Sequence, residues 1–340
     1  MHWIIYISLP VAAVLILLYL YAFRYEPTHF GLSNVNIFIK GKPSPAAGED
    51  KSGKTGKLLL TILHLSDFHL RKNFKGKKLF KFVQSLAGMN VDLIFITGDL
   101  IGNSVSTEYM IEMLGPLKAK LGKYAIFGVH DHYDKALMEF VRNMFKRKKS
   151  YRKENDIADM VKQLKSIGIE VLINESRKIE FNTDGINSIE IIGLDDPIVK
   201  KIDIGKAFSH IDPISRMEPV EKSDYRKVFA LSETNIHEIN NNGKLRIVII
   251  HTPDTDSIIN LARKKTDIIF SGHTHGGQVR LPLVGAIISG CKIKTKFASG
   301  LFYLRTLILY VSRGLGEGKY SQFRFYCPPE ASLIKIYKID

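Results

Sequence analysis

Short apolar runs separated by polar turns recur along most of this 340-residue chain. Five runs are rich in Ile, Leu, Val and aromatic residues and barely alternate: residues 58–65, 93–97, 124–127, 245–250 and 267–270. Runs of this kind are typical of strands buried on both faces. Further short runs predict strands of a second sheet at 170–173, 178–181 and 188–192, and returning strands at 307–311 and 332–337. Apolar residues at helical spacing predict a helix over 157–167.

The distances between successive apolar runs indicate how the strands connect. From Asp67 to Asp99 is 32 positions, and from Asp99 to His130 is 31. A strand, a crossover helix and the next parallel strand need about 30 residues, so these three residues would follow adjacent parallel strands. The predicted fold class is α/β, with two sheets packed as a β-sandwich and flanked by helices.

The amino terminus carries an apolar stretch of a different kind. Trp3 to Phe23 is 21 residues without a charge, which is long enough for a helix to cross a hydrocarbon core of about 30 Å. A cleaved signal peptide fits less well, because no Lys or Arg precedes the stretch and no small-residue cleavage pattern follows it. We therefore expect a single-pass transmembrane anchor at residues 1–25.

The rest of the chain divides into a linker and one large domain. Residues 26–57 are predicted to be a flexible tether, because residues 41–57 have almost no apolar side chain to bury. Residues 58–340 are long enough for one domain. A lid or cap insertion is expected around 136–235, from the charged stretch 136–153 and the polar stretch 200–221.

The distribution of charged residues predicts the membrane orientation of the protein and the kind of partner it binds. Arg24 and five lysines between residues 40 and 57 follow the apolar span, so the positive-inside rule predicts a protein of the inner (cell) membrane with its catalytic domain in the cytoplasm. The presence of only two cysteines suits a reducing compartment. The net charge of +15 gathers in basic clusters, which favours an anionic membrane surface and an anionic substrate as partners. Nucleic acid is not expected, because no motif for it is recognisable.

Histidine and aspartate side chains follow each of the five buried runs. They lie in the segments Ser66–His69, Gly98–Asp99, Gly128–Asp131, His251–Pro253 and Gly272–Gly277. Each segment alone is most simply a polar turn. Together they offer enough carboxylate oxygens and imidazole nitrogens for two metal ions, at the strand ends where open α/β sheets place their ligand sites.

These segments resemble the calcineurin-like metallophosphoesterase superfamily, whose pattern is D-x-H, G-D, G-N-H-D/E, H and G-H-x-H. The segments 251–254, 271–282, 314–316 and 329–330 are similar to its bacterial membrane-associated branch. The resemblance covers residues 58–337, weakly between 135 and 243. It is most specific in the Gly-His-Thr-His-Gly-Gly-Gln stretch that begins at Gly272.

The resemblance implies roles for particular residues. Asp67, His69 and His275 would hold one divalent ion, and His251 and His273 the second, with Asp99 bridging the two. Manganese is the first expectation, and iron, zinc or magnesium are alternatives. Two such ions would clamp a phosphoryl group and activate a shared hydroxide for in-line attack.

Two further residues would take part in catalysis. His130 would donate a proton to the leaving oxygen or stabilise charge on the phosphoryl group, and Asp131 would orient it. A carboxylate that only begins a helix is the alternative for Asp131.

One position departs from the family pattern. Val129 stands where the family has an Asn whose side-chain oxygen binds the second ion, and an isopropyl group cannot ligate a metal. The second ion would bind weakly, rely on water or borrow a neighbour. The nearby candidates are His132, Ser66 and His64, for which packing or turn chemistry is the simpler explanation.

The expected activity is metal-dependent hydrolysis of a phosphoester or pyrophosphate at the membrane. The resemblance extends to UDP-2,3-diacylglucosamine diphosphatases of lipid A biosynthesis, which would make the substrate a lipid-linked nucleotide. A general envelope phosphodiesterase or phosphatase is one alternative, and a catalytically impaired metal-binding module is another. The apolar stretch 281–288 predicts either a strand of the sheet or a surface that receives acyl chains.

Overall fold

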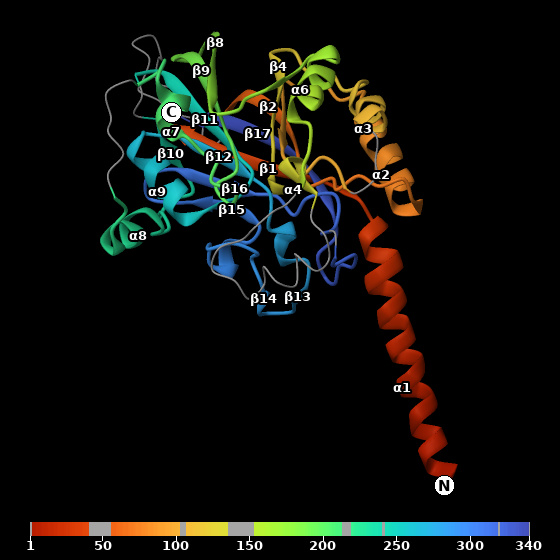
Figure 1. Ribbon diagram of the computed structural model, residues 1–340. Helices are drawn as coiled ribbons and strands as arrows, with labels where there is room; N and C mark the ends of the chain where they lie inside the picture. The colour runs from red at the N-terminus through yellow and green to blue at the C-terminus, as the bar shows by residue number, and fades with distance from the viewer. Residues whose placement is uncertain are drawn as a thin grey trace.

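The structure is a computed structural model. It describes residues 2–40, 56–102, 107–134, 153–212, 219–239, 242–318 and 320–339, and the side chains of all of these except residues 2–8, 134 and 153. Figure 1 shows a globular part from which one long helix projects.

The first sheet has seven strands. Its order is β10 (His237–Glu238), β1 (Gly31–Lys40), β17 (Glu330–Ile339), β2 (Lys57–Leu65), β3 (Leu93–Thr97), β4 (Gly122–Ile126) and β7 (Ile169–Val171). The neighbours β2, β3 and β4 are parallel, and helices α2 (Phe74–Ser85) and α3 (Thr107–Leu114) form the crossovers between them. The connection predicted from the spacing of Asp67, Asp99 and His130 is therefore confirmed.

The second sheet has six strands. Its order is β15 (Gly300–Tyr303), β16 (Ile308–Val311), β12 (Ile268–Ser271), β11 (Lys244–Ile250), β9 (Ile186–Leu194) and β8 (Glu175–Thr183). Strands β11 and β12 are parallel. Residues 170–173 were expected here, but β7 pairs with β4 in the first sheet, because the preceding helix α6 (Ile157–Ser166) returns the chain beside β4.

The two sheets pack face to face as the predicted sandwich. Their inner faces share one apolar core, to which Ile62 and Phe95 contribute from one sheet and Ile247 and Phe270 from the other. Helices α2, α3 and α6 cover one outer face (Figure 1). Helices α7 (Ile204–Phe208), α8 (Lys222–Val228) and α9 (Thr255–Arg263) cover the other.

The lid expected around 136–235 differs from what the structure shows. Residues 153–194 supply α6 and the strands β7, β8 and β9, and α7 buries Ile204 and Phe208 against the second sheet. These segments carry enough apolar side chains to join the sandwich and its helical layer. Residues 135–152 and 213–218, which include most of the charged stretch, lie outside the described residues.

The tether expected at 26–57 is also different in its first part. Residues 31–40 form β1, which pairs in parallel with β17 along its full length. Ile37 and Ile39 are completely buried, so this strand belongs to the core. Residues 41–55 lie outside the described residues.

The long helix joins the globular part directly. Helix α1 (His2–Leu20) continues through a π-helical turn (Tyr21–Tyr25) and a 3-10 turn (Glu26–Thr28). Residues Leu9–Thr28 are apolar and long enough to cross a membrane, and side chains 9–20 are exposed. The structure therefore carries a candidate membrane span where the sequence predicts one.

A short segment near the carboxyl end holds the last turns of this helix. The backbone N–H of Arg324 donates to the carbonyl of Ala22 at 3.0 Å. The buried carboxylate of Glu26 accepts from the N–H of Tyr326 at 2.8 Å and from that of Cys327. The helix is thus fixed to the domain by buried hydrogen bonds.

The apolar stretch 281–288 joins neither sheet. It forms a separate hairpin of β13 (Arg280–Leu281) and β14 (Gly285–Ala286). The expectation of a sheet strand is wrong here, because the pairing is local and most of the apolar side chains point to solvent.

Candidate metal centre

The five polar segments meet at one edge of the sandwich. Asp67 and His69 follow β2, and Asp99 follows β3. His251 follows β11 and His273 follows β12. Because the carboxyl ends of parallel strands lie at the same edge of a sheet, two facing sheets bring these side chains together.

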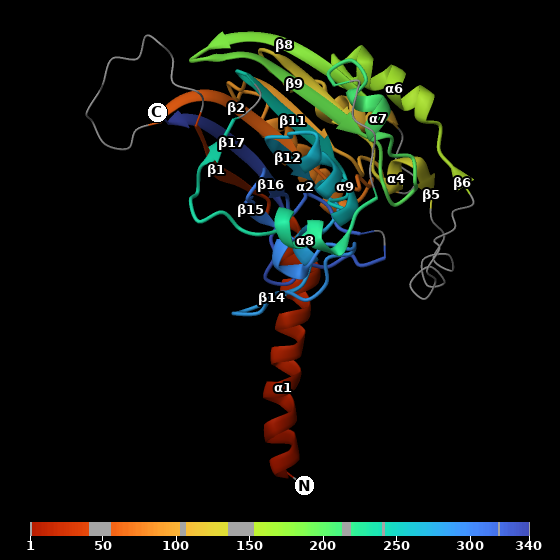
Figure 2. The ribbon, with the colours of Figure 1, turned by 90° about the vertical axis from the view of Figure 1, so that its left-hand side faces the viewer.

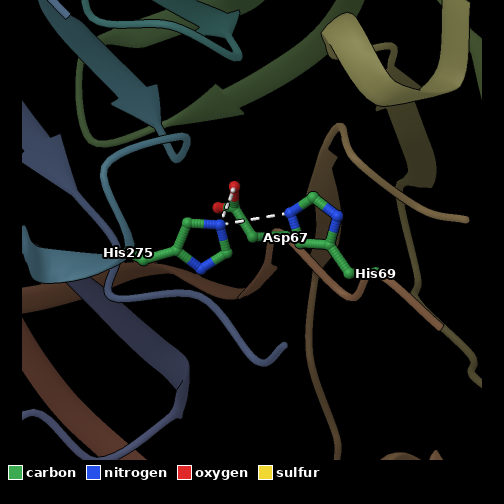
Figure 3. Close-up of side chains that lie close together, drawn as sticks. All are labelled: Asp67, His69 and His275. Atoms are coloured by element: carbon green, nitrogen blue, oxygen red, sulfur yellow. Dashed lines mark hydrogen bonds and ion pairs between the residues drawn. The ribbon is translucent and has the colours of Figure 1, made fainter. Parts of the chain in front are cut away.

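The first cluster joins Asp67, His69 and His275, as Figure 3 shows. The Nε2 atoms of His69 and His275 lie 3.1 Å apart. The Nε2 of His275 is 3.7 Å from Oδ1 of Asp67. All three residues are buried and come from both sheets.

The second cluster joins Asp99, His251 and His273. The Nε2 of His251 lies 3.2 Å from Oδ2 of Asp99 and 3.3 Å from Nδ1 of His273. The same Oδ2 of Asp99 lies 3.4 Å from Nε2 of His69 in the first cluster. Asp99 therefore lies between the two clusters.

Hydrogen bonds from the surrounding loops orient these ligands. The Nδ1 of His251 lies 2.6 Å from the carbonyl of Thr97, and Nδ1 of His275 lies 3.2 Å from that of Gly316. A ring that donates from Nδ1 presents the lone pair of Nε2 to the centre. Ser66 donates its hydroxyl to Oδ2 of Asp67 at 2.5 Å, so this serine positions a ligand.

The backbone at the centre is strained. Asp67, His69, Asp99, His273 and His275 all have positive φ, between 39° and 68°. Residues with a Cβ rarely adopt this conformation, which costs about 1 kcal/mol or more at each position. Such clusters of strained residues occur where the surrounding fold holds side chains in a functional geometry.

Two glycines allow the loops to approach this closely. A Cβ on Gly128 would lie 2.3 Å from Oδ1 of Asp99. A Cβ on Gly272 would lie 1.9 Å from Oγ of Ser66. Any side chain at either position would displace Asp99 or Ser66.

His130 and Asp131 occupy the short helix α4 (Val129–His132) at the edge of the centre. The ring centroids of His130 and His69 lie 4.8 Å apart, and the backbone N–H of His130 donates to Oδ1 of Asp99 at 2.8 Å. A ring nitrogen of His130, a ring nitrogen of His69 and a carboxylate oxygen of Asp99 all lie within 4.8 Å of one another. His130 therefore lies beside a residue of each cluster, His69 in the first and Asp99 in the second.

The carboxylate of Asp131 accepts hydrogen bonds from backbone N–H groups. It accepts from the N–H groups of Leu100, Ile101 and Gly128, at 2.8, 3.3 and 2.9 Å. The bond to Gly128 is the one expected of a carboxylate that begins a helix. The bonds to Leu100 and Ile101 also connect α4 to the loop after β3. Burial and the nearby Asp99 raise the pKa of Asp131 to about 7.

His132 and His64, considered above as replacements for the missing Asn, both have other partners. Nε2 of His132 lies 2.5 Å from Oδ1 of Asp195, and Nε2 of His64 lies 2.8 Å from Oγ1 of Thr97. Val129 itself is buried. The second cluster thus offers one carboxylate and two imidazoles.

The chemistry of the donors fits divalent cations. Burial lowers the pKa of His69 well below its ordinary value and also lowers that of His275, which keeps both rings neutral, as metal ligation requires. Burial also opposes a charge on His251, but Asp99 outweighs it and raises the pKa of His251 well above its ordinary value. A proton there balances the carboxylate charge, and a divalent cation would do the same.

Two positioning residues were missed in the sequence. The side-chain amide of Asn155 donates to the carbonyl of Asp131 at 3.0 Å and so supports α4. Asp196 is buried and accepts from the hydroxyl of Thr252 at 2.7 Å, beside His251. Nothing in the sequence spacing of Asp196 indicated a contact with the segment after β11.

Comparison with known proteins agrees with this geometry. The profile of the calcineurin-like phosphoesterase family matches residues 60–277. UDP-2,3-diacylglucosamine pyrophosphatase LpxG of Chlamydia trachomatis is 26% identical over 313 residues, which cover 81% of this chain and 83% of the relative. Phosphodiesterase YaeI of Escherichia coli is 25% identical, with 81% of each chain covered.

A zebrafish relative also bears on the membrane span. The Danio rerio transmembrane protein with metallophosphoesterase domain is 26% identical over 76% of this chain and 48% of its own length. The profile match, the relatives and the ligand clusters agree on a hydrolase that uses divalent metals. This chain belongs to the calcineurin-like phosphoesterase family.

Proposed function

We propose that this protein is a membrane-anchored hydrolase that cleaves a phosphoester or pyrophosphate bond in a lipid-linked nucleotide, with UDP-2,3-diacylglucosamine as the best candidate. The observation that carries the proposal is the convergence of six candidate ligands, five of them buried, from four strand ends of both sheets. A fold held only for structural reasons would have no need of strained backbone at five of these ligands.

The two clusters would hold two divalent ions, with manganese the first candidate. Asp67, His69 and His275 would hold one, and His251 and His273 the other, with Asp99 between them. When bound, such ions polarise phosphoryl oxygens and supply hydroxide at neutral pH.

The protein's own residues would position the reacting groups. His130 borders both clusters and would donate a proton to the leaving oxygen, which makes it the proposed catalytic residue. Asp131 and Asn155 would hold the loop of His130 in place through backbone hydrogen bonds.

A lipid-linked substrate is supported by what surrounds the centre. A cleft beside His69 leads to Pro27 and Phe30, at the end of the apolar helix. Arg71 and Lys75 also line this cleft and pair with Glu317. Cationic groups between the metal ligands and the membrane helix suit an anionic headgroup, and LpxG, a relative, is named for a lipid-linked nucleotide sugar.

The test is release of UMP by the purified full-length chain with manganese. We expect turnover of UDP-2,3-diacylglucosamine and its loss in Asp99→Asn. His130→Gln should lower turnover by about 100-fold while keeping the metals, because only proton donation is removed. No release of UMP under these conditions would contradict the substrate proposal.

A second candidate is a general phosphodiesterase, which the relative YaeI favours. Turnover of an aryl phosphodiester without release of UMP would support it. Inactivity on both substrates with metals bound would instead favour a metal-binding module impaired by Val129.

A further inference from the structure

The hairpin formed by residues 280–288 exposes a dense group of aliphatic side chains. Leu283 is fully exposed, Val284 is 72% exposed and Ile288 is 67% exposed, and Leu281 and Ile287 add to the same group. Single exposed apolar residues are ordinary on a protein surface, but a contiguous group of this kind marks an interaction site. Among the described residues, only the apolar helix α1 exposes a longer run.

The hairpin lies at the same end of the molecule as α1. Figures 1 and 2, which differ by a quarter turn, both place β14 at the end of the domain from which α1 projects. In both views the hairpin is level with the upper part of α1 rather than with the sheets. A bilayer crossed by α1 would therefore meet the hairpin as well.

One segment holds both elements. The N–H of Arg280 donates to the carbonyl of Phe325 at 2.9 Å, and the N–H of Phe325 donates to that of Gln278 at 3.0 Å. The Phe325 ring meets the ring of Tyr21, at the end of the helix, with centroids 5.8 Å apart. The hairpin and the helix are thus fixed to each other through the same residues.

The hairpin also lies close to the candidate metal centre, both along the chain and in space. Its first strand follows His275 after four residues, and a Cβ on Gly290, just after it, would lie 3.7 Å from Nε2 of His273. Exposed lysines 292, 294 and 296 come next along the chain. Lys292 pairs with Asp256 at 3.2 Å. Exposed aliphatic side chains that are followed along the chain by basic residues suit the interfacial region of an anionic bilayer.

We propose that the hairpin 280–288 inserts its aliphatic side chains into the interfacial layer of the bilayer and holds the metal centre at the membrane surface. This inference rests on the membrane anchoring proposed above. Because α1 is fixed to the domain, α1 alone would still allow the whole molecule to tilt against the bilayer. A second contact that begins at the metal ligands would fix the face on which a lipid headgroup is met.

Depth-dependent fluorescence quenching by brominated lipids tests the hairpin and the anchor separately. Trp3 is the only tryptophan, so full-length Trp3→Phe provides a background for one reporter at a time. The reporters are Leu283→Trp in the hairpin, Leu15→Trp in α1 and Leu58→Trp, an exposed position at the start of β2. Each is reconstituted in nanodiscs of phosphatidylethanolamine and phosphatidylglycerol, with bromine near the headgroup or near the chain ends.

We expect bromine near the headgroup to reduce the emission of Leu283→Trp by about twofold, because interfacial side chains lie only 5 to 10 Å deep. Leu58→Trp should keep its emission, and Leu15→Trp should respond most to bromine near the chain ends. An unquenched Leu283→Trp overturns the inference, and a blue-shifted but unquenched one shows that the hairpin is buried against protein instead. Failure of Leu15→Trp to respond would contradict the anchor, whatever the hairpin does.

Discussion

Individual residues at the centre have backbone conformations that lower the stability of the fold but bring the side chains together. Five ligands adopt a left-handed backbone, and Gly128 and Gly272 leave no room for a side chain. Carboxylates and neutral imidazoles held this close together repel or compete for protons unless a cation lies between them. The residue-level geometry is therefore best satisfied by bound metal.

Val129→Asn should strengthen the second cluster. The substitution supplies a side-chain oxygen at the position where the family has one, so we expect affinity for the second ion to rise about tenfold, or about 1.4 kcal/mol. Isothermal titration with manganese measures the change. Val129→Leu, which branches like Asn but has no donor atom, is the matched control, and equal affinities in both variants would contradict this account of the position.

His64 should make the fold sensitive to acid. Burial lowers the pKa of His64 to about 3, so the folded state keeps it neutral while the unfolded chain takes up a proton below pH 6.5. The stability from the neutral ring is present above pH 6.5 and is lost as the pH falls from there toward 3. Thermal unfolding at pH 7.5 and 5.5 should show that His64→Gln removes about 1.4 kcal/mol of the wild-type loss at the lower pH. An identical loss in both proteins would argue against this role.

At the scale of elements, strands with a clear apolar pattern in their own residues were predicted correctly. A strand that depends on a partner far away in the sequence was not. The runs before Asp67, Asp99 and His251 are rich in Ile, Leu and Val, so β2, β3 and β11 could be predicted from the sequence. The segments with the candidate ligands follow these strands directly, so the sequence also predicted that the six residues would lie close together. Strand β1 was missed because residues 31–40 alternate weakly beside a polar stretch, and their partner β17 lies almost 300 residues away. Left-handed ligands could not be foreseen, since nothing in an Asp or His specifies positive φ.

The junction of α1 with the domain should depend on Glu26. Its two carboxylate oxygens accept from the N–H groups of Tyr326 and Cys327, and Glu26→Gln leaves only one acceptor for two donors. We expect a loss of about 2 kcal/mol in the free energy of unfolding, because a buried donor loses its partner. Glu108→Gln, an exposed glutamate of α3, is the control in the same chemical denaturation. A loss no larger than that of the control would show that this junction adds no stability.

The whole molecule is a sandwich whose candidate metal centre, apolar hairpin and candidate membrane helix are joined through the segment 323–327. This arrangement supports a substrate with its lipid part in the bilayer and its phosphates at the centre. Within the described residues, α1 is connected rigidly to the domain, because buried hydrogen bonds hold its last turns.

The proposed cytoplasmic orientation predicts the behaviour of reporters fused after Asp340. A green fluorescent protein there should fluoresce and an alkaline phosphatase should be inactive, because the former folds poorly and the latter well in an exported compartment. The basic residues that follow α1 are the reason for this expectation. The reverse pattern would place the domain outside the cytoplasm.

The central claim is that side chains from both sheets hold two metal ions, and anomalous scattering from a crystal soaked in manganese tests it most directly. The account predicts two peaks, one among Asp67, His69 and His275 and one among Asp99, His251 and His273. Asp99 should contact both. A single peak would contradict the dinuclear centre, and no peak among these residues would contradict the metal site as a whole.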